Sequence, residues 1–473
     1  SLIARQVAHH GFDLSGDEFI AAFQAKIFLE GRILAPLDPA GLEMARALQP
    51  VFVFTDAEHG LWGSHYRPVF AAMRAVAMAL GADAALNPAM AALAAAATYR
   101  VIKALHPDRP DAALVGALVL AVSPQVIATA ASGFSFPAHL AFNMCWLACF
   151  LRGGARGHLA AIVIGVAALG LHQVHVHALF AAPFVAALLL GAFPGRGWAL
   201  AYGAAYVPAV AAWIIWPELA VWLQTGDAGA VPLSLWQAHY FSSFGGAGGD
   251  SGLTVTPITP DGLPAGPLMA INLARLAAWL SPALLALFLM GAGGWRRLAT
   301  AERVCLLSIA LSIGFRWVFV PDQMHGWGYR HLHPWIGLMA VVAAAGYARP
   351  PAAVDVRRLG GFVAALIAVS ALALAPLKLW QVERKVGPRA AGQAYLSALD
   401  VDVAVLDARL VWFGDDLVRN DPFLRNRPLL LLRRALPATW PDAPRFSGSV
   451  ATGLEGDLRA LGVSAGGMLE PSP

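Results

Sequence analysis

Residues 87–131, NPAMAALAAAATYRVIKALHPDRPDAALVGALVLAVSPQVIATAA, decide the class of fold of this chain. The stretch holds two apolar runs, 87–105 and 111–131, separated by a short polar turn that contains Arg109. Each run is about 20 residues long, which is the length that an α-helix needs to cross the hydrocarbon core of a bilayer. The stretch therefore predicts two antiparallel transmembrane helices joined by a short loop.

The same pattern continues along the chain. Of its 473 residues, 58% are hydrophobic and only 13% are charged, whereas about a quarter of the residues in a soluble domain are charged. The pattern predicts an all-α polytopic membrane protein with ten spans, the other eight being 136–152, 158–174, 176–193, 198–217, 270–291, 303–320, 333–348 and 359–381. The apolar stretch 66–82 contains Arg67 and Arg74, so we expect an interfacial or re-entrant helix there.

Basic residues predict the orientation of these spans. One set of alternate loops carries Arg100, Lys103, Arg109, Arg152, Arg156, Arg196, Arg296, Arg297, Arg303, Arg349, Arg357 and Arg358. The opposite interhelical loops carry only Arg330. The positive-inside rule then places 1–86, 218–269, 321–332 and 382–473 on the outer face, the periplasmic side of a bacterial-type inner membrane. The chain begins at Ser1 without Met, and we expect a preceding segment, such as a first transmembrane helix.

Three regions follow from this topology. We expect an outer-face region with juxtamembrane helices (1–86), a bundle of about ten helices (87–381) and a small periplasmic α/β tail (382–473). The tail contains two predicted buried strands, Val401–Leu406 and Pro428–Leu432. The outer loop 218–269 has no Lys or Arg and would act either as a lid over a site or as a connector.

Cysteine usage and charge exclude two classes of protein. Cys145, Cys149 and Cys305 all lie in apolar segments, so no disulfide framework is expected. The net charge of +4 comes from basic residues dispersed among short loops, a distribution that does not favour a nucleic-acid partner.

Polar residues beside the predicted spans gather on the outer face. Because a polar side chain near lipid is energetically costly, each is expected to have a structural or functional role. Asp17 and Glu18 directly precede an amphipathic stretch, Phe19–Glu30. They would cap that helix together with Ser15, and capping is compatible with catalysis because it fixes a carboxylate in place. The other outer-face residues are Asp13, Asp56, Glu58, His59, His139, His172, Gln173, His175, His177, Arg275, Arg316, Arg330, His331 and His333.

The segment His172-Gln173-Val174-His175-Val176-His177 has two interpretations. Its alternating histidines would chelate a divalent metal ion such as Zn²⁺ if the segment were extended and a carboxylate completed the ligand shell. Otherwise the histidines would hydrogen-bond a polar head group or neighbouring helices. No cofactor is assigned beyond this alternative of a metal at His172, His175 and His177.

Four stretches, in order, resemble the GT-C superfamily of membrane glycosyltransferases, of the protein mannosyltransferase and aminoarabinose transferase type. They are Gly16-Asp17-Glu18 with Ala25–Arg32, Ser64-His65-Tyr66-Arg67-Pro68, Asn87–Leu105 with Leu114–Pro124, and Gly328-Tyr329-Arg330-His331-Leu332-His333-Pro334. The resemblance covers about residues 10–380. In two places the chain departs from the family pattern. The second Pro of a Tyr-Pro-Pro segment is absent, with Arg67 intruding, and Ser132-Gly133-Phe134-Ser135 lacks the usual second Asp, for which Asp56 or Glu58 is a substitute.

The resemblance implies an inverting transfer of a sugar from a polyprenyl-phosphate donor in the membrane lipid to a glycan, lipid or protein acceptor. A carboxylate takes the acceptor proton, and cations neutralise the leaving phosphate. The implied catalytic residues are Asp17 and Glu18. The implied donor phosphate-binding residues are Arg330, His331, Arg316 and Arg275. The implied sugar- or acceptor-binding residues are Asp56, Glu58, His172, Gln173, His175 and Tyr329.

The main alternative function is a polytopic transporter or flippase for a lipid-linked glycan. Transporters place their sites near the bilayer midplane and show internal repeats. No repeat is evident, and the polar residues gather at one face, which favours chemistry at the membrane surface. A non-catalytic scaffold that displays the tail would leave the acidic pair and the histidines unexplained.

Overall fold

The computed structural model describes residues 1–227, 265–319, 323–411, 413–438, 440, 446 and 448–464. Most of the predicted loop 218–269 lies outside these residues. Within them, its first part belongs to helix α12 (Trp216–Thr225) and its last part to α14 (Ala265–Trp279).

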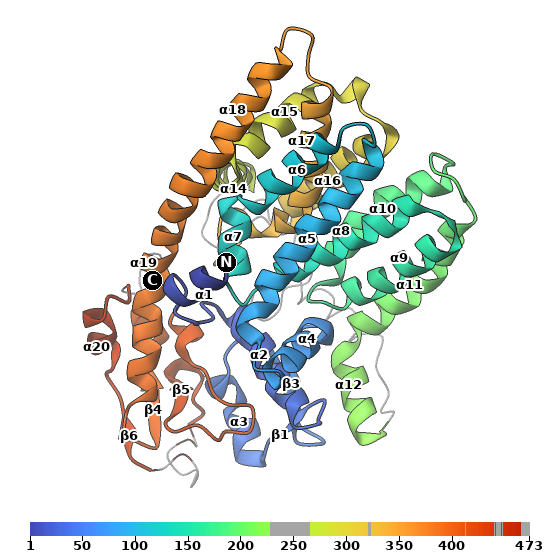
Figure 1. The fold of residues 1–473 in the computed structure, drawn as a ribbon. Coiled ribbons are helices and arrows are strands. Elements are labelled where there is room, and N and C mark those ends of the chain that lie inside the picture. Colours follow the sequence, from blue (N-terminus) through green and yellow to red (C-terminus); the bar gives the residue numbers. More distant parts are fainter. Residues whose placement is uncertain are drawn as a thin grey trace.

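A bundle of helices forms the larger part of the molecule (Figure 1). Its remaining helices are α5 (Asp83–Leu105), α6 (Pro110–Ala121), α7 (Pro124–Ala130), α8 (Phe136–Arg152), α9 (Gly154–Leu169), α10 (Val174–Leu189), α11 (Trp198–Ile214), α15 (Pro282–Gly293), α16 (Thr300–Phe319), α17 (Ile336–Ala348), α18 (Val356–Val369) and α19 (Ala375–Ser397). Helix α17 is apolar all round and is buried from Ile336 to Gly346, as expected of a helix at the centre of a bundle. The predicted all-α polytopic fold is therefore confirmed.

The chain bends sharply beside prolines within two of the predicted spans and at the end of a third. The expectation of one helix over 270–291 is wrong, because α14 and α15 meet at an angle of 119°. Pro282 begins α15, and a proline has no N–H with which to continue the preceding helix. Pro124 and Pro217 stand at the starts of α7 and α12, where the chain bends by 57° and 78°.

One of the described helices, the 41-residue Arg357–Ser397, is by itself long and apolar enough to cross a bilayer. The number rises to four when each sharply bent pair is taken as one span. This long helix joins α18 and α19 through a five-residue π-helical segment, Ser370–Leu374. The total of ten spans stays a prediction.

The N-terminal region forms a small layer at one end of the bundle (Figure 1). It contains α1 (Leu2–Val7), α2 (Gly16–Leu29), α3 (Pro39–Leu48), α4 (Pro68–Ala79), β1 (Ala35–Pro36), β2 (Val53–Asp56) and β3 (Leu61–Ser64). The strands pair antiparallel in the order β1-β3-β2, with Thr55 opposite Trp62. Helix α4 provides the helix expected within 66–82.

The tail is a small α/β unit, as the sequence predicts. Strands β4 (Val403–Leu406) and β5 (Leu429–Leu432) pair parallel, and β6 (Val450–Ala451) pairs parallel with the other side of β4. Short 3₁₀ turns and helix α20 (Glu455–Ala460) complete it, and the turn Gly414–Leu417 contacts the start of α2 through Asp416.

The N-terminal region and the tail share one hydrophobic core. Ile20 and Phe23 of α2 and Trp62 of β3 pack in the same cluster as Val403 of β4 and Leu431 of β5. Figure 1 shows the tail sheet beside α2 and α3, at the end of the bundle opposite the α17–α18 connection. The two regions therefore cover the same end of the bundle.

Candidate active site

Asp17 lies in the first turn of α2, in a position that its neighbours fix. Ser15 caps the helix, and Glu18 completes a capping box in which Glu18 Oε2 accepts a 2.9 Å hydrogen bond from Ser15 N. The N-terminus of a helix favours a carboxylate because the helix dipole is positive there. The capping that the sequence suggests is therefore present, and the Asp17 side chain is left to make other contacts.

Asp17 contacts two other parts of the chain. Its Oδ1 accepts a 2.5 Å hydrogen bond from the Tyr66 hydroxyl, and its Oδ2 lies 2.7 Å from Arg330 Nη1. The side chains of Asp17 and Arg330 are 12% and 8% exposed. The structure thus joins the candidate base to the candidate phosphate ligand, although 313 residues separate them in the sequence.

Aromatic rings surround this ion pair. The Tyr66 ring lies 3.8 Å from the His172 ring and 4.9 Å from the Phe52 ring, measured between centroids. On the other side, the Arg330 guanidinium lies 5.0 Å from the centroid of Phe134 and 5.8 Å from that of Phe136. Such cation–π contacts hold a guanidinium in place while leaving its N–H groups available.

Burial raises the pKa of the Asp17 carboxyl, but the charge of Arg330, the His172 ring and the hydrogen bond from Tyr66 together lower the pKa below its ordinary value of 3.8. Asp17 is therefore ionised at neutral pH in this arrangement. An ionised carboxylate is the form that accepts a proton.

Glu18 connects α2 to the segment 132–135. Gly133 N donates a 2.8 Å hydrogen bond to Glu18 Oε1. A Cβ at Gly133 would overlap Asp13 Oδ1 and come within 2.8 Å of Asp13 Cγ. The Asp13 carboxylate and the Glu18 Cβ therefore lie where a side chain at position 133 would project.

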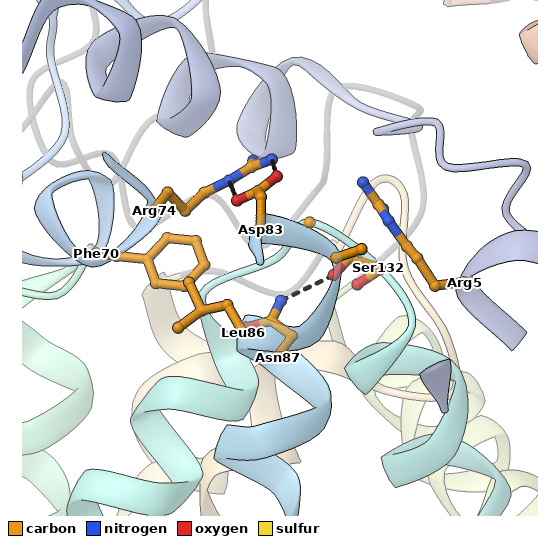
Figure 2. Close-up of a pocket in the computed structure, with 9 residues that line it drawn as sticks. Arg5, Phe70, Arg74, Asp83, Leu86, Asn87 and Ser132 are labelled. Carbon is orange, nitrogen blue, oxygen red and sulfur yellow. Dashed lines mark hydrogen bonds and ion pairs between the residues drawn. The ribbon is translucent and has the colours of Figure 1, made fainter. Parts of the chain in front are cut away.

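Two guanidinium groups hold Asp13. Its Oδ1 lies 2.8 Å from Arg5 Nη2 and its Oδ2 lies 3.0 Å from Arg74 Nη1. Arg74 also pairs with Asp83 at 2.8 Å. Figure 2 shows Arg74 and Asp83 paired at a small pocket, where Asn87 donates a 2.8 Å hydrogen bond to the carbonyl of Ser132. This pocket adjoins the Glu18 side of α2 and is not lined by Asp17 or Arg330.

Burial and the neighbouring Asp13 carboxylate raise the pKa of Glu18 to about 7. The Glu18 side chain is fully buried and accepts hydrogen bonds from the backbone N–H groups of Ser15 and Gly133. These contacts occupy both of its oxygens. Glu18 thus belongs to the packing that holds α2 and the 132–135 segment together.

Arg316 is fully buried within α16. Among the described residues, none forms a hydrogen bond with its Nε, Nη1 or Nη2 atoms. A buried guanidinium without a partner is costly. The role of Arg316 as a phosphate ligand stays a prediction.

The histidine turn is largely helical, so the extended geometry needed for metal chelation is not present. His175 and His177 belong to α10, and only His172 and Gln173 precede it. His177 Nδ1 lies 2.8 Å from Asn143 Oδ1, and the His175 ring stacks 5.3 Å from Phe315. The contact of His177 with Asn143 is of the kind that the hydrogen-bonding alternative expects, and the metal alternative stays a prediction.

Several other predicted residues are placed as follows. Tyr329 is fully buried, and its carbonyl accepts a 2.9 Å hydrogen bond from Gln125. His331 is buried against Phe136 at 6.2 Å. Arg275 is exposed on α14.

Asp56 and Glu58 lie at the end of β2, beside His59. The His59 ring lies 2.7 Å from Asp56 and 3.4 Å from Asp227. Glu58, His59 and Asp227 form the one group among the described residues whose donor atoms are close enough to hold a metal ion. The ion pair of His59 with Asp227 accounts for the closeness of these two side chains.

Some residues of the site carry little signal in the sequence. Tyr66 is part of a family-like stretch, and its neighbour Pro68 starts α4, but nothing in the stretch reveals that its hydroxyl binds Asp17. The role of Phe134 is also hidden, because an aromatic residue between apolar helices is common. Asp13 and Arg74 stand out as polar residues near lipid, but their pairing depends on the fold.

Comparison with one solved structure supports this fold. The chain superposes on ArnT from Cupriavidus metallidurans in the apo state with a TM-score of 0.54, at 12% identity, over 90% of this chain and 83% of that one. It also matches the apo oligosaccharyltransferase of Archaeoglobus fulgidus with a TM-score of 0.49, at 12% identity, over 91% of this chain and 63% of that one. No protein-family model matches the chain, and no curated protein matches it in sequence. The likeness to ArnT shows that this chain shares the fold of that protein, and it agrees with the resemblance carried by the four sequence stretches.

Proposed function

We propose that the protein is a membrane glycosyltransferase that moves a sugar from a polyprenyl-phosphate donor to an acceptor hydroxyl on the periplasmic face. The observation that carries this proposal is the contact between Asp17 and Arg330, 2.7 Å apart and mostly buried. One partner is suited to accept a proton and the other to bind a phosphate. The GT-C fold supports the same class of reaction.

The reaction follows from these two side chains. The acceptor hydroxyl attacks the anomeric carbon of the donor sugar and gives its proton to an oxygen of Asp17 as the new C–O bond forms. The bond between the anomeric carbon and the phosphate oxygen breaks, and the polyprenyl phosphate leaves with the electron pair. Arg330 stabilises the negative charge that develops on the phosphate. A single displacement of this kind inverts the configuration at the anomeric carbon.

The ion pair suggests how donor binding prepares the base. A donor phosphate that takes N–H groups of Arg330 weakens the pairing of Arg330 with Asp17. Because that pairing lowers the pKa of Asp17, its loss returns the carboxylate toward its ordinary basicity. Tyr66 keeps the carboxylate in position during the exchange, since its hydrogen bond to Oδ1 is separate from the contact of Oδ2 with Arg330.

Arg316 supplies a second cation for the donor phosphate in this proposal. Its guanidinium is fully buried and has no hydrogen-bond partner among the described residues, so an anion beside it would offset the cost of that burial. His331 and the exposed Arg275 stay secondary candidates for the same phosphate.

The sugar and the acceptor are assigned to the side of the site that Tyr66 and His172 line. His172 packs against Tyr66 and is therefore the best placed of the predicted sugar ligands. Gln173, His175 and Tyr329 lie in adjoining segments, and Asp56 and Glu58 lie farther along the N-terminal sheet. For Glu18 we propose a positioning role, because both of its oxygens bind backbone N–H groups.

The test is the Asp17→Asn variant, assayed in lipid nanodiscs with labelled undecaprenyl-phosphate pentose and hexose donors. We expect transfer to fall by about 10²-fold or more, the usual contribution of a general base, while donor binding is retained. Asp400→Asn, which changes an exposed carboxylate of the tail, is the control and should transfer normally. Full transfer by Asp17→Asn would remove it as the base. A parent protein that binds no lipid-linked sugar would contradict the proposed function.

A further inference from the structure

A loop of the tail, 413–422, reaches the start of the helix that carries Asp17. Asp416 Oδ1 accepts a 2.8 Å hydrogen bond from Gly16 N, the backbone N–H next to Asp17. Arg419 donates a 3.2 Å hydrogen bond to the carbonyl of Leu14, and its guanidinium lies 4.2 Å from the centroid of Phe12. The tail thus holds both sides of the turn that leads into α2.

The second oxygen of Asp416 reaches the segment that carries Arg330. Asp416 Oδ2 lies 2.9 Å from His325 Nε2, and the two side chains are 10% and 3% exposed. The His325 ring also packs 4.1 Å from the ring of Phe413, measured between centroids. One buried carboxylate of the tail therefore bridges the two chain segments that meet in the Asp17–Arg330 pair.

Hydrogen bonds hold the segment between His325 and Arg330 in place, so the contact at His325 affects the position of Arg330. Gln323 donates a 2.8 Å hydrogen bond to the carbonyl of Gly328 and accepts a 2.9 Å hydrogen bond from Arg330 N. His325 lies inside this closed loop, so its position is coupled to that of the Arg330 backbone.

The packing around Gly16 is independent evidence that Asp416 fits closely against the start of α2. A Cβ at Gly16 would come within 2.5 Å of Val51 Cγ2 and 3.2 Å of Asp416 Oδ1. The absence of a side chain at Gly16 is therefore what lets Asp416 approach the helix end. A backbone N–H at the first turn of a helix has no partner within the helix, so the tail supplies one.

We propose that Asp416 is a positioning residue through which the C-terminal tail sets the register between Asp17 and Arg330. This inference rests on the proposed glycosyl transfer for its catalytic consequence. The contacts of Asp416 with Gly16 and His325 are seen in the structure and do not depend on the proposed activity. Asp416 does not touch the reacting groups, so it acts only through Gly16 and His325.

The experiment compares Asp416→Ala, Asp416→Asn and the matched control Asp415→Ala in full-length protein in nanodiscs. Asp415 is the neighbouring carboxylate and pairs with Arg434 within the tail, so its loss should leave α2 unaffected. The Asp416→Asn variant keeps an oxygen that can accept from Gly16 N, whereas the Asp416→Ala variant has none. Hydrogen–deuterium exchange of peptides covering 12–19 and 323–330 reports the bridge without any assay of transfer.

We expect exchange in 12–19 to be about tenfold faster in Asp416→Ala than in the parent, as for a lost hydrogen bond to a charged group. We also expect kcat for transfer to fall about tenfold with little change in KM for the donor. Asp416→Asn should restore exchange in 12–19 and most of kcat. Asp415→Ala should match the parent in both measurements.

Unchanged exchange in 12–19 for Asp416→Ala would overturn the proposal, and so would Asp416→Asn being as impaired as Asp416→Ala. A kcat that is unaffected while exchange rises would also overturn it, since the bridge would then not position the catalytic pair. If the parent transfers no sugar, the proposed function fails by itself, and exchange alone decides whether Asp416 holds α2.

Discussion

At the scale of single residues, the Asp17–Arg330 contact explains how two costly charges persist near lipid. Each charge offsets the free-energy cost of burying the other. Tyr66 donates a hydrogen bond to Asp17, and the ring of Phe134 packs against Arg330. Removing one partner of such a pair leaves the other buried without compensation. Variants at these positions therefore need a measurement of folding beside any measurement of function.

Arg330→Ala should weaken binding of a polyprenyl-phosphate sugar by about 10–100-fold, because a hydrogen bond between charged groups contributes roughly 1.5–3 kcal/mol. Arg330→Lys should recover part of the affinity, since lysine keeps the charge but not the planar fork. Direct titration of folded protein with the donor measures both. Arg32→Ala, an exposed arginine of the same region, is the control. An unchanged dissociation constant for Arg330→Ala would exclude it from the phosphate site.

The raised pKa of Glu18 predicts that the stability of the folded protein depends on pH. Its pKa is about 7 in the folded protein against an ordinary 4.5, so the folded state binds the proton more tightly. The resulting stabilisation is present below about pH 4.5 and is lost as the pH rises through 7. Thermal unfolding midpoints of the parent should therefore fall from pH 5 to pH 8 relative to those of Glu18→Gln, which does not titrate. A difference between the two proteins that stays constant with pH would contradict this assignment.

At the scale of elements, the start of α2 and the 132–135 segment form one unit. Glu18 accepts from Gly133 N, Asn87 donates to the carbonyls of Ser132 and Phe134 at 2.8 Å, and Phe134 supports Arg330. The adjacent residues Asp17 and Glu18 thus reach Arg330 by two routes. One is direct, and the other runs through the 132–135 segment.

Gly133→Ala should destabilise the protein by about 1–3 kcal/mol, as overpacking of a filled interior does. The added methyl group would meet Asp13 and come within 3.1 Å of Glu18 Cβ. Unfolding in detergent measures the change. Gly203→Ala on α11, where a Cβ meets nothing within 4 Å, should leave stability the same or raise it slightly. Equal stability of the two variants would show that the Gly133 contact is not tight.

At the scale of the whole molecule, the N-terminal region and the tail pack as one layer over one end of the bundle. Trp62 Nε1 donates a 2.9 Å hydrogen bond to the carbonyl of Pro422, and Asn420 donates to the carbonyls of Leu48 and Leu430. The contacts of Trp62 with Pro422 and of Asn420 with Leu48 join segments at opposite ends of the sequence. The predicted regions 1–86 and 382–473 therefore share one hydrophobic core.

Leu431→Ala tests this shared core. Leu431 is fully buried among Ile20, Phe23 and Trp62, so its truncation should cost about 2–5 kcal/mol. We expect faster tryptic cleavage at Arg46 in α3 as well as within the tail. Leu461→Ala, which truncates a side chain that is 40% exposed, should leave cleavage at Arg46 unchanged. Cleavage confined to the tail in Leu431→Ala would show that the two regions are stabilised separately.

The sequence by itself determined the helical membrane class, the positions of most helices and the strands at 403–406 and 429–432. These are local properties, set by runs of apolar residues and by prolines at helix starts. It also singled out Asp17 and Arg330 as the residues to examine. Only the tertiary structure decided that they touch, that Tyr66 and Phe134 flank them, that Asp13 and Glu18 fill the space beside Gly133, and that Asp416 reaches Gly16 across the molecule. Contacts between residues hundreds of positions apart depend on how helices pack, and hydrophobic periodicity does not encode which polar side chains that packing brings together.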